Sequence, residues 1–296
     1  MKWKVDQDYH EALLRDYLHQ ARGISRRTLT AVKFRGGKLF VNNQEVNVRH
    51  ILSEGDNVEV IFPPETRSEL LKPEPLPLDI VYEDDDVLVV NKQAYIATMP
   101  SYHHPQHTLS NAVIFHYDQE QLPYTVHVVT RLDRDTSGLL LIAKHRHSHS
   151  VLFRDQHEGT VNRRYQAIVS GIMEDKKGTL DLAIDRAPDS IIRRVVSPSG
   201  KRAITHYQVL EEQDDVSLVE VRLETGRTHQ IRVHFSAVGH PLIGDSLYQG
   251  DTTFLDRQAL HCHQLGFHHP MTRERLQFEI PLADELERTW ESLKKQ

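Results

Sequence analysis

The sequence predicts an α+β protein made of a small N-terminal unit and a larger second unit. Its 296 residues are enough for one large domain plus a small one. A proline-rich stretch divides the chain after about residue 62. Strand-like and helix-like patterns occur on both sides of that stretch, and no internal repeat is visible.

The first unit, residues 1–62, is predicted to contain helices followed by short strands. Apolar side chains recur at helical spacing between Leu13 and Leu18, and Ser25 is a suitable N-cap for a second helix. Residues 38–46 form two short runs around Asn42-Asn43, a pair typical of a hairpin turn. A turn and a final alternating strand close the unit at residues 52–62.

A linker is predicted at residues 63–77. Five prolines are spread through this polar segment: Pro63, Pro64, Pro73, Pro75 and Pro77. Because proline lacks a backbone N–H and has a fixed φ, this density excludes a helix or a central strand. The segment is therefore expected to be an extended connection between the two units.

The second unit, residues 78–296, is predicted to be one α+β domain. Its strand candidates are short apolar or alternating runs rich in β-branched residues. They are Ile80–Tyr82, Val87–Asn91, Leu139–Ala143, Tyr165–Val169, Thr205–Leu210, Val216–Leu223 and Arg275–Ile280. Helices are expected at Ser110–Tyr117, His147–Gln156 and Thr228–Val238.

The chain has a formal net charge of −6, but its basic residues concentrate in the first unit. Nucleic-acid binding requires a local positive potential rather than a positive net charge of the whole chain. The candidates for RNA phosphate contacts are Arg22, Arg26, Arg27, Lys33, Arg35 and Lys38. Glu45 is the one acid in residues 22–49. A solvated charged face is the ordinary alternative, and the local concentration of basic residues favours RNA binding over it.

Composition and cysteine content predict a cytoplasmic protein. Hydrophobic residues make up 39% and charged residues 26%, as in ordinary globular proteins. No secretory signal is visible, and the apolar run Leu139–Ala143 is far too short to span a bilayer. Cys262 is the only cysteine, which excludes an internal disulfide and fits a reducing compartment. No membrane contact is expected.

Residues 128–143 hold the most informative pattern in the chain. Asp133 lies in a polar segment that leads through Thr136-Ser137-Gly138 into an apolar strand. A loop at the edge of a buried strand is a rigid place from which to present a carboxylate. An aspartate before a strand is by itself more often a turn residue, so the surrounding pattern has to decide.

The segment Arg131-Leu-Asp-x-x-Thr-Ser-Gly resembles the signature of the RluA/RluD-type ribosomal large subunit pseudouridine synthases. The resemblance continues through five ordered blocks: LDIVYEDDDVLVVNK, RRYQAIVSG, GKRAITHYQVL, LETGRTHQIRVHFSAVGHPLIGD and QALHCHQLGFHHP. It implies a catalytic domain with a mixed, largely antiparallel central sheet. The first unit, from Ile24-Ser-Arg-Arg to Leu52-Ser-Glu-Gly-Asp, resembles a small S4-type RNA-binding domain of α/β fold.

The resemblance implies a role for four residues of the second unit. Asp133 matches the catalytic aspartate of the family, and Arg232 matches the arginine that pairs with it. Tyr165 matches a tyrosine that packs on the target base and is a candidate general base. Arg131 is expected near the space that the flipped nucleotide leaves in the RNA.

Four positions depart from the family pattern. Thr130 stands where the family usually has histidine. Gln93, Tyr95 and Met99 stand where proline, glycine and histidine are usual. These changes leave the proposed catalytic groups in place, but the shape of the loop at the entrance of the site stays open.

These residue types suit the isomerisation of uridine to pseudouridine. The reaction breaks the N1–C1′ bond, turns the uracil and rejoins it through C5. A carboxylate can add to the substrate or stabilise charge on the sugar, and a nearby guanidinium keeps it ionised. No electrons are exchanged and no group is lost, so no cofactor is expected. The histidine clusters lack metal-ligand spacing, so no metal is expected either.

The sequence therefore predicts an RNA pseudouridine synthase that works as a monomer on structured RNA. Large-subunit rRNA is the expected substrate, and tRNA is the alternative. A second function, a non-catalytic RNA-binding or ribosome-assembly protein on the same scaffold, is opposed by the intact Asp133, Tyr165 and Arg232. A metal-dependent hydrolase that uses the histidine clusters is a distant third.

Overall fold

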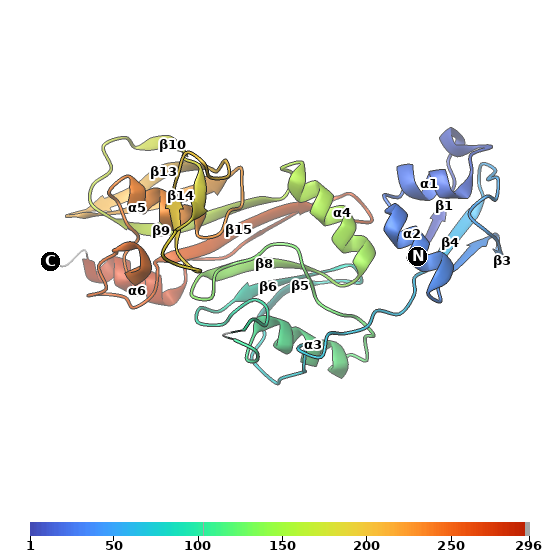
Figure 1. Cartoon of the computed structure of the whole chain (residues 1–296), viewed down its shortest axis with the longest axis horizontal. Coiled ribbons are helices and arrows are strands. Elements are labelled where there is room, and N and C mark those ends of the chain that lie inside the picture. The colour runs from blue at the N-terminus through green and yellow to red at the C-terminus, as the bar shows by residue number, and fades with distance from the viewer. Residues whose placement is uncertain (103, 294–296) are drawn as a thin grey trace.

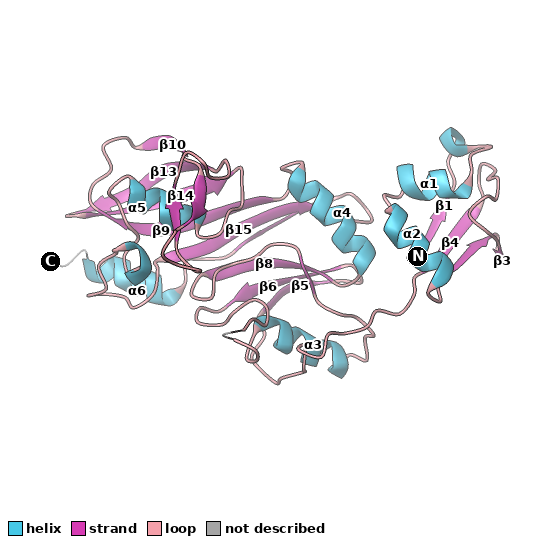
Figure 2. Ribbon diagram, viewed as in Figure 1, coloured by secondary structure: helices cyan, strands magenta, loops and turns pink. Residues whose placement is uncertain are grey.

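The chain forms two units joined by an extended segment, as Figure 1 shows. The structure is a computed structural model that describes residues 1–102 and 104–293. The N-terminal unit lies beyond one end of the long sheet of the second unit, and helix α4 (Arg146–His157) lies between them (Figure 1). Strands make up most of the second unit, with helices packed around them (Figure 2).

The N-terminal unit packs two helices, α1 (Leu14–Gln20) and α2 (Arg26–Phe34), with a four-stranded sheet of order β1-β4-β2-β3. The other elements are η1 (Gln7–Tyr9), β1 (Lys2–Lys4), β2 (Lys38–Val41), β3 (Gln44–Glu45) and β4 (Asn57–Ile61). Leu14, Leu18 and Val58 belong to a buried apolar cluster that is separate from the core of the second unit. The unit therefore has a hydrophobic core of its own.

Two local predictions for this unit are confirmed. The Ser25 hydroxyl accepts a hydrogen bond from the Thr28 N–H at 3.1 Å and so caps α2. Asn42 and Asn43 have φ values of 50° and 66°, as a tight hairpin turn between β2 and β3 requires. Asparagine tolerates this left-handed region better than most residues do.

The second unit is built on one mixed sheet, which has ten strands in the described part of the chain. Its order is β10-β13-β14-β9-β15-β8-β6-β5, with β16 paired to β15 and β7 paired to β8. The pairing of β15 with β8 is parallel, and the other pairings are antiparallel. The predicted mixed, largely antiparallel sheet is therefore confirmed.

The bounds of the strands in this unit follow the chain. They are β5 (Ile80–Glu83), β6 (Val87–Lys92), β7 (His127–Val128), β8 (Ser137–Ala143), β9 (Asn162–Ser170), β10 (Lys177–Asp181), β13 (Ile204–Gln213), β14 (Val216–Leu223), β15 (Leu260–His268) and β16 (Arg275–Glu279). A separate pair is formed by β11 (Ile184–Arg186) and β12 (Arg194–Val196). The remaining helices are α3 (Leu109–Gln119), α5 (Gln230–Ala237), η2 (Ser246–Tyr248) and α6 (Asp284–Leu293).

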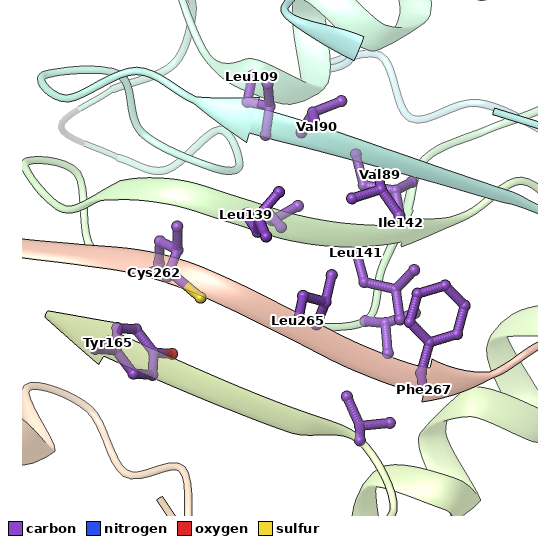
Figure 3. Packing of buried hydrophobic residues seen from close by; sticks show 14 of the residues in the cluster. Val89, Val90, Leu109, Leu139, Leu141, Ile142, Tyr165, Cys262, Leu265 and Phe267 are labelled. Carbon is purple, nitrogen blue, oxygen red and sulfur yellow. The ribbon is translucent and has the colours of Figure 1, made fainter. Parts of the chain in front are cut away.

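A continuous apolar core surrounds the central strands of the sheet. Leu139, Leu141 and Ile142 of β8 lie together with side chains of β6 and β15 in Figure 3. Every residue of β8 is buried. Since burying one aliphatic side chain contributes about 1.5–3 kcal/mol, the core fixes the position of β8 strongly. The loop that carries Asp133 leads directly into this strand.

Gly138 allows β8 and β15 to approach each other closely. Its φ is +113°, and a Cβ atom at this position would lie 2.3 Å from the carbonyl oxygen of Cys262. A side chain would therefore collide with the backbone of β15, and the backbone conformation itself favours glycine. This close contact holds the start of β8, and the loop before it, against β15.

The proline-rich segment between the two units lacks regular structure and lies on the second unit. Residues 63–79 contain no helix or strand, as the proline content predicts. Arg67 nevertheless pairs with Asp118 and donates a hydrogen bond to the carbonyl oxygen of Tyr124 at 2.8 Å. Leu71 is buried in the main core. The segment is therefore fastened to the surface of the second unit.

The two units touch at the beginning of α4. The ring of Phe62 stacks on His147 with a centroid distance of 5.7 Å, and Trp3 meets His147 edge-on at 6.1 Å. Burial, followed by the nearby His145, lowers the pKa of His147 to about 4. His147 is therefore neutral at neutral pH and belongs to an apolar contact.

Acid is expected to weaken the fold through His147. The folded protein binds this proton less readily than the unfolded chain, with pKa values of about 4 and 6.5, so stability falls as the pH drops through this range. Between pH 7.5 and pH 5 the loss is about 2 kcal/mol. Urea unfolding at both pH values measures it. His147→Phe keeps a flat ring against Phe62, so its loss of stability between the two pH values should be about 2 kcal/mol smaller than that of the wild type. Equal losses in both proteins would contradict the assignment.

The sequence missed several elements of the second unit, and β15 and α6 are the most important. In β15, His261 and His263 are buried among apolar residues, so the strand shows neither an alternating pattern nor a purely apolar run. In α6, charged residues surround the few buried positions. The predicted strands and helices are all present, with ends that shift by a few residues.

Candidate active site

A cleft of about 640 Å³ opens beside the loop that precedes β8. Its walls come from residues 98–101 and 128–136, from α4 and β9, and from residues 223–232 at the start of α5. Among the described residues that line it, the arginines are Arg131, Arg163, Arg227 and Arg232, and the one acid is Asp133. The cleft is therefore strongly positive although the whole chain is acidic, and it suits an anionic ligand.

Hydrogen bonds from buried side chains fix the loop that carries Asp133. Three such side chains each donate to a different carbonyl group of the loop. The pairs are Thr98 with Leu132 (2.9 Å), Lys92 with Arg134 (2.9 Å) and Arg257 with Asp135 (3.1 Å). Because each carbonyl already has a buried donor, the loop has few alternative conformations and presents its carboxylate rigidly.

The amine of Lys92 is buried beneath the catalytic loop. Its Nζ also donates to the carbonyl groups of Gln93 and Ile96, at 2.8 and 2.9 Å. Burial lowers the pKa of Lys92 to about 7, and the nearby carboxylates of Asp135 and Asp133 oppose that shift. Three acceptors for three N–H groups explain how this side chain is accommodated under the loop.

Arg232 joins Asp133 to a second, fully buried carboxylate. Its Nη1 lies 3.1 Å from Oδ2 of Asp133, while its Nε and Nη2 donate to Asp245 at 2.6 and 2.8 Å. Asp245 has an exposed side-chain fraction of only 1%, and Asp133 has one of 29%. Burial alone lowers the pKa of Arg232, but the hydrogen bonds and charges of the two carboxylates raise it above its ordinary value. The guanidinium is therefore a permanent cation, fixed by Asp245 and directed at Asp133.

His229 and Tyr248 complete the surroundings of this arginine. His229 precedes α5 and has a φ of +57°. Its Nδ1 and the Tyr248 hydroxyl share a hydrogen bond of 2.9 Å. The guanidinium of Arg232 lies 5.0 Å from the centre of the Tyr248 ring. Burial lowers the pKa of His229, so its ring is neutral at neutral pH and adds no second cation beside Asp133.

Tyr165 lies on β9 in the wall of the cleft, next to Cys262 of β15 (Figure 3). Only 4% of the residue is exposed, and its oxygen accepts a hydrogen bond from Arg163 at 3.3 Å. Burial raises the pKa of the Tyr165 phenol well above its usual value of 10. The phenol is therefore protonated at neutral pH, which fits an aromatic wall better than a general base.

Arg131 is exposed at the cleft and makes no ion pair or hydrogen bond with a described side chain. The structure thus brings all four predicted residues of the second unit to one cleft. Asp133 and Arg232 are in direct contact, Tyr165 forms a wall, and Arg131 is free to meet a ligand.

The predicted basic residues of the first unit fall into two groups. Arg22 is folded back, since its Nε donates to the Tyr17 hydroxyl at 2.8 Å, and Lys38 pairs with Glu45 at 3.2 Å. The others are exposed and have no ion pair within the described part of the chain: Arg26, Arg27, Lys33 and Arg35. These four side chains are the ones available to phosphate groups.

The departures from the family pattern have local explanations. Thr130 is buried, and its hydroxyl oxygen accepts the Leu141 N–H at 2.9 Å, which ties the catalytic loop to β8. Tyr95 has φ +67°, the region that favours glycine, and its hydroxyl bonds to Asp256. Met99 lines the cleft, whereas Gln93 is exposed outside its lining. The entrance therefore differs from the usual pattern mainly at Met99.

One group of described residues places three metal-ligating atoms within 4.8 Å: Asp84, Asp86 and His269. Nδ1 of His269 accepts the backbone N–H groups of Met271 and Thr272 at 3.3 and 3.1 Å. Since Nδ1 is an acceptor, the ring hydrogen lies on Nε2, the atom that faces both carboxylates. A protonated nitrogen cannot bind a metal ion, so this group fits carboxylate–imidazole contacts instead.

Sequence reasoning missed Asp245, Arg163 and His229. Asp245 follows Arg232 by thirteen positions across a loop, a separation at which no sequence pattern predicts contact. All three lie within blocks that carry the family resemblance, RRYQAIVSG for Arg163 and LETGRTHQIRVHFSAVGHPLIGD for His229 and Asp245, and this was the signal available. In the described part of the chain, no helix is long and apolar enough to cross a membrane.

Comparison with known proteins identifies one family. The model of RNA pseudouridylate synthases matches residues 86–237. An uncharacterised RNA pseudouridine synthase of Bacillus subtilis is 52% identical over 264 residues, which cover 89% of this chain and 93% of that protein. Ribosomal large subunit pseudouridine synthase D of Haemophilus influenzae is 36% identical, with coverage of 86% and 82%. The human RNA pseudouridylate synthase domain containing 1 has a TM-score of 0.59 at 26% identity, over 75% of this chain and 97% of that one.

Proposed function

Because this chain belongs to the RNA pseudouridine synthase family, we propose that its cleft isomerises a uridine of structured RNA with Asp133 as the catalytic carboxylate. The observation that carries the proposal is the 3.1 Å contact between Asp133 and Arg232 inside the arginine-lined cleft. The region that matches the family contains both residues.

Asp133 acts on the ribose or on the uracil ring of the bound nucleotide. Breaking the N1–C1′ bond leaves positive charge on the sugar and negative charge on the freed uracil. An ionised carboxylate can add to the substrate or stabilise the positive charge electrostatically. When C5 joins C1′, the proton at C5 leaves to water and N1 takes up a proton, so the product is an isomer of the starting nucleotide.

Arg232 holds the carboxylate of Asp133 in place. Because Asp245 binds Nε and Nη2, the remaining Nη1 is the atom left to meet Asp133. A guanidinium at hydrogen-bond distance favours the charged form of a carboxylate. Asp245 is thus a positioning residue, which acts on the substrate only through Arg232.

Tyr165 and Arg131 receive the nucleotide. A base taken out of its RNA helix loses stacking worth roughly a few kcal/mol, which an aromatic wall can partly restore. Tyr165 supplies such a wall. Arg131, which is free of described partners, is suited to the phosphates or to the space that the base leaves.

The N-terminal unit, residues 1–62, is proposed to be an S4-like RNA-binding domain, with residues 63–77 as linker and residues 78–296 as the catalytic domain. Support comes from the separate core of the first unit and from the exposed Arg26, Arg27, Lys33 and Arg35. Side chains of this kind on phosphates set the orientation of an RNA without specifying its sequence.

Large-subunit rRNA is the proposed substrate, because relatives that align over most of the chain are ribosomal large subunit pseudouridine synthases. The enzyme is proposed to act in the cytoplasm as a monomer, with neither metal nor cofactor. The isomerisation exchanges no electrons, and a carboxylate with a guanidinium suffices for its acid–base and electrostatic needs.

The wild-type protein should release tritium from unmodified large-subunit rRNA transcripts labelled at uracil C5. Release from tRNA transcripts should be much smaller, and a chelator should leave the rate unchanged. Release from tRNA alone would overturn the rRNA assignment. Failure to release tritium from any cellular RNA would overturn the enzymatic function.

A further inference from the structure

Helix α4 carries a row of rings along one face. His149, Phe153 and His157 follow one another at intervals of four residues, which places their side chains one above the other. Ring centroids lie 6.0 Å apart between His149 and Phe153 and 4.3 Å apart between Phe153 and His157. These three residues are termed the α4 ring row.

The α4 ring row continues the wall of the catalytic cleft. His149 and Phe153 line the cleft together with Arg131 and Arg163, whereas His157 is exposed outside it. His149 also stacks on His127 at 5.3 Å, which fixes the inner end of the row. The rings therefore lead from the site of reaction to the surface.

Phe153 is the most exposed ring of the cleft wall, with 51% of its surface accessible. The preceding residues Val151 and Leu152 of the same helix are buried. Single exposed apolar side chains are ordinary on protein surfaces. This one differs because aromatic rings lie on both sides of it and because it borders a cleft whose charge suits an anion.

Cations lie on both sides of the α4 ring row, in the cleft and toward the N-terminal unit. Arg131 is free in the cleft, and Arg154, exposed and without an ion pair in the described residues, lies against Gly23 of the N-terminal unit. Burial lowers the pKa of His149, so its ring offers a neutral face at neutral pH. Neutral rings flanked by arginines form the combination that single-stranded nucleic acids bind.

We propose that the α4 ring row stacks on unpaired nucleotides next to the target uridine and leads the RNA along α4 from the cleft to the surface. The proposal rests on the RNA-modifying function above but assigns a site outside the reacting nucleotide. Since every base has a π face, the row tolerates different sequences, while Arg131 and Arg154 meet the phosphates. Helix α4 lies between the two parts of the protein that the RNA would touch (Figure 1).

Binding of a fluorescein-labelled octauridylate, measured by anisotropy, tests the proposal on the full-length protein. Phe153→Ala is expected to weaken binding about 5- to 100-fold, the range of one lost base–aromatic stack. Phe153→Trp keeps a ring and should bind within about twofold of wild type. Phe153→Leu keeps an apolar side chain without a π face and should resemble the alanine variant.

The matched control is Leu210→Ala, since Leu210 is 42% exposed but does not line the cleft. Leu210→Ala should bind the octauridylate like the wild type. In the tritium assay, Phe153→Ala should raise KM much more than it lowers kcat. Wild-type affinity in Phe153→Ala or in Phe153→Leu would overturn the proposal. So would a dimer in sedimentation experiments that Phe153→Ala dissociates without changing RNA affinity, because the row would then be a contact between two copies.

Discussion

Asp133→Asn is expected to lower the rate of pseudouridine formation at least about 10³-fold, a loss typical of removing a group that acts in the transition state. The amide has the shape of the carboxylate but neither its charge nor its nucleophilicity. Since Arg232 keeps its two hydrogen bonds to Asp245, the fold and the cleft should be preserved. Tritium release under single-turnover conditions measures the effect, and RNA affinity should stay close to that of wild type.

Asp135→Asn is the matched control for this experiment. Asp135 lies two residues further along the same loop and pairs with Arg134, but its side chain does not line the cleft. Its substitution should lower the rate far less than Asp133→Asn does, because this carboxylate faces Arg134 outside the cleft. Equal losses in the two variants would mean that the loop is merely sensitive to charge, and that Asp133 has no special role.

Asp245→Asn is expected to cost about 3–5 kcal/mol of unfolding free energy, because it leaves a buried guanidinium without its main counter-charge. The same substitution should lower activity, since Arg232 loses the negative charge and one of the two hydrogen bonds that direct it at Asp133. Urea unfolding measures the first effect, and tritium release at a temperature where the variant is folded measures the second.

Two further variants separate the causes. Asp189→Asn breaks an exposed aspartate–arginine contact and should change stability little. Arg232→Met combined with Asp245→Leu removes both buried charges and should be more stable than Asp245→Asn alone, yet inactive. If the double variant were the less stable of the two, the buried pair would not be the source of the loss. If it kept full activity, Arg232 would have no part in the reaction.

Much of the fold followed from local sequence patterns. The Ser25 cap, the Asn42-Asn43 turn and the apolar run of β8 depend on a few neighbouring residues, and the structure confirms each of them. Gly138 is explained only by the structure, because the strand that it approaches is more than a hundred residues away. Local chemistry thus predicts elements, and packing decides which of them meet.

The elements and contacts that sequence reasoning missed have a common cause. Strand β15 buries His261 and His263 in the middle of the sheet, where Ser137 hydrogen-bonds to His261 and Glu220 lies 3.4 Å from His263. Likewise, Asp245 is buried only because Arg232 binds it. Polar residues that are buried through a distant partner give no local signal.

The distribution of charge explains how an acidic chain can bind RNA. Several carboxylates outside the cleft are paired, as Asp86 with His145 and Glu83 with Lys144. The cleft itself has one carboxylate among four arginines, and the first unit exposes further cations without partners. The local electrostatic potential of the cleft, and not the net charge of −6, therefore determines which molecule binds.

A map of the pseudouridines in cellular RNA tests the central claim most directly. Cells that lack this gene would be complemented with either the wild-type protein or Asp133→Asn, and large-subunit rRNA and tRNA would be compared. At least one uridine of the large-subunit rRNA should be isomerised with the wild-type protein and should remain uridine in the other two strains. A map that is identical in all strains, or one that Asp133→Asn restores in full, would contradict the role of this cleft.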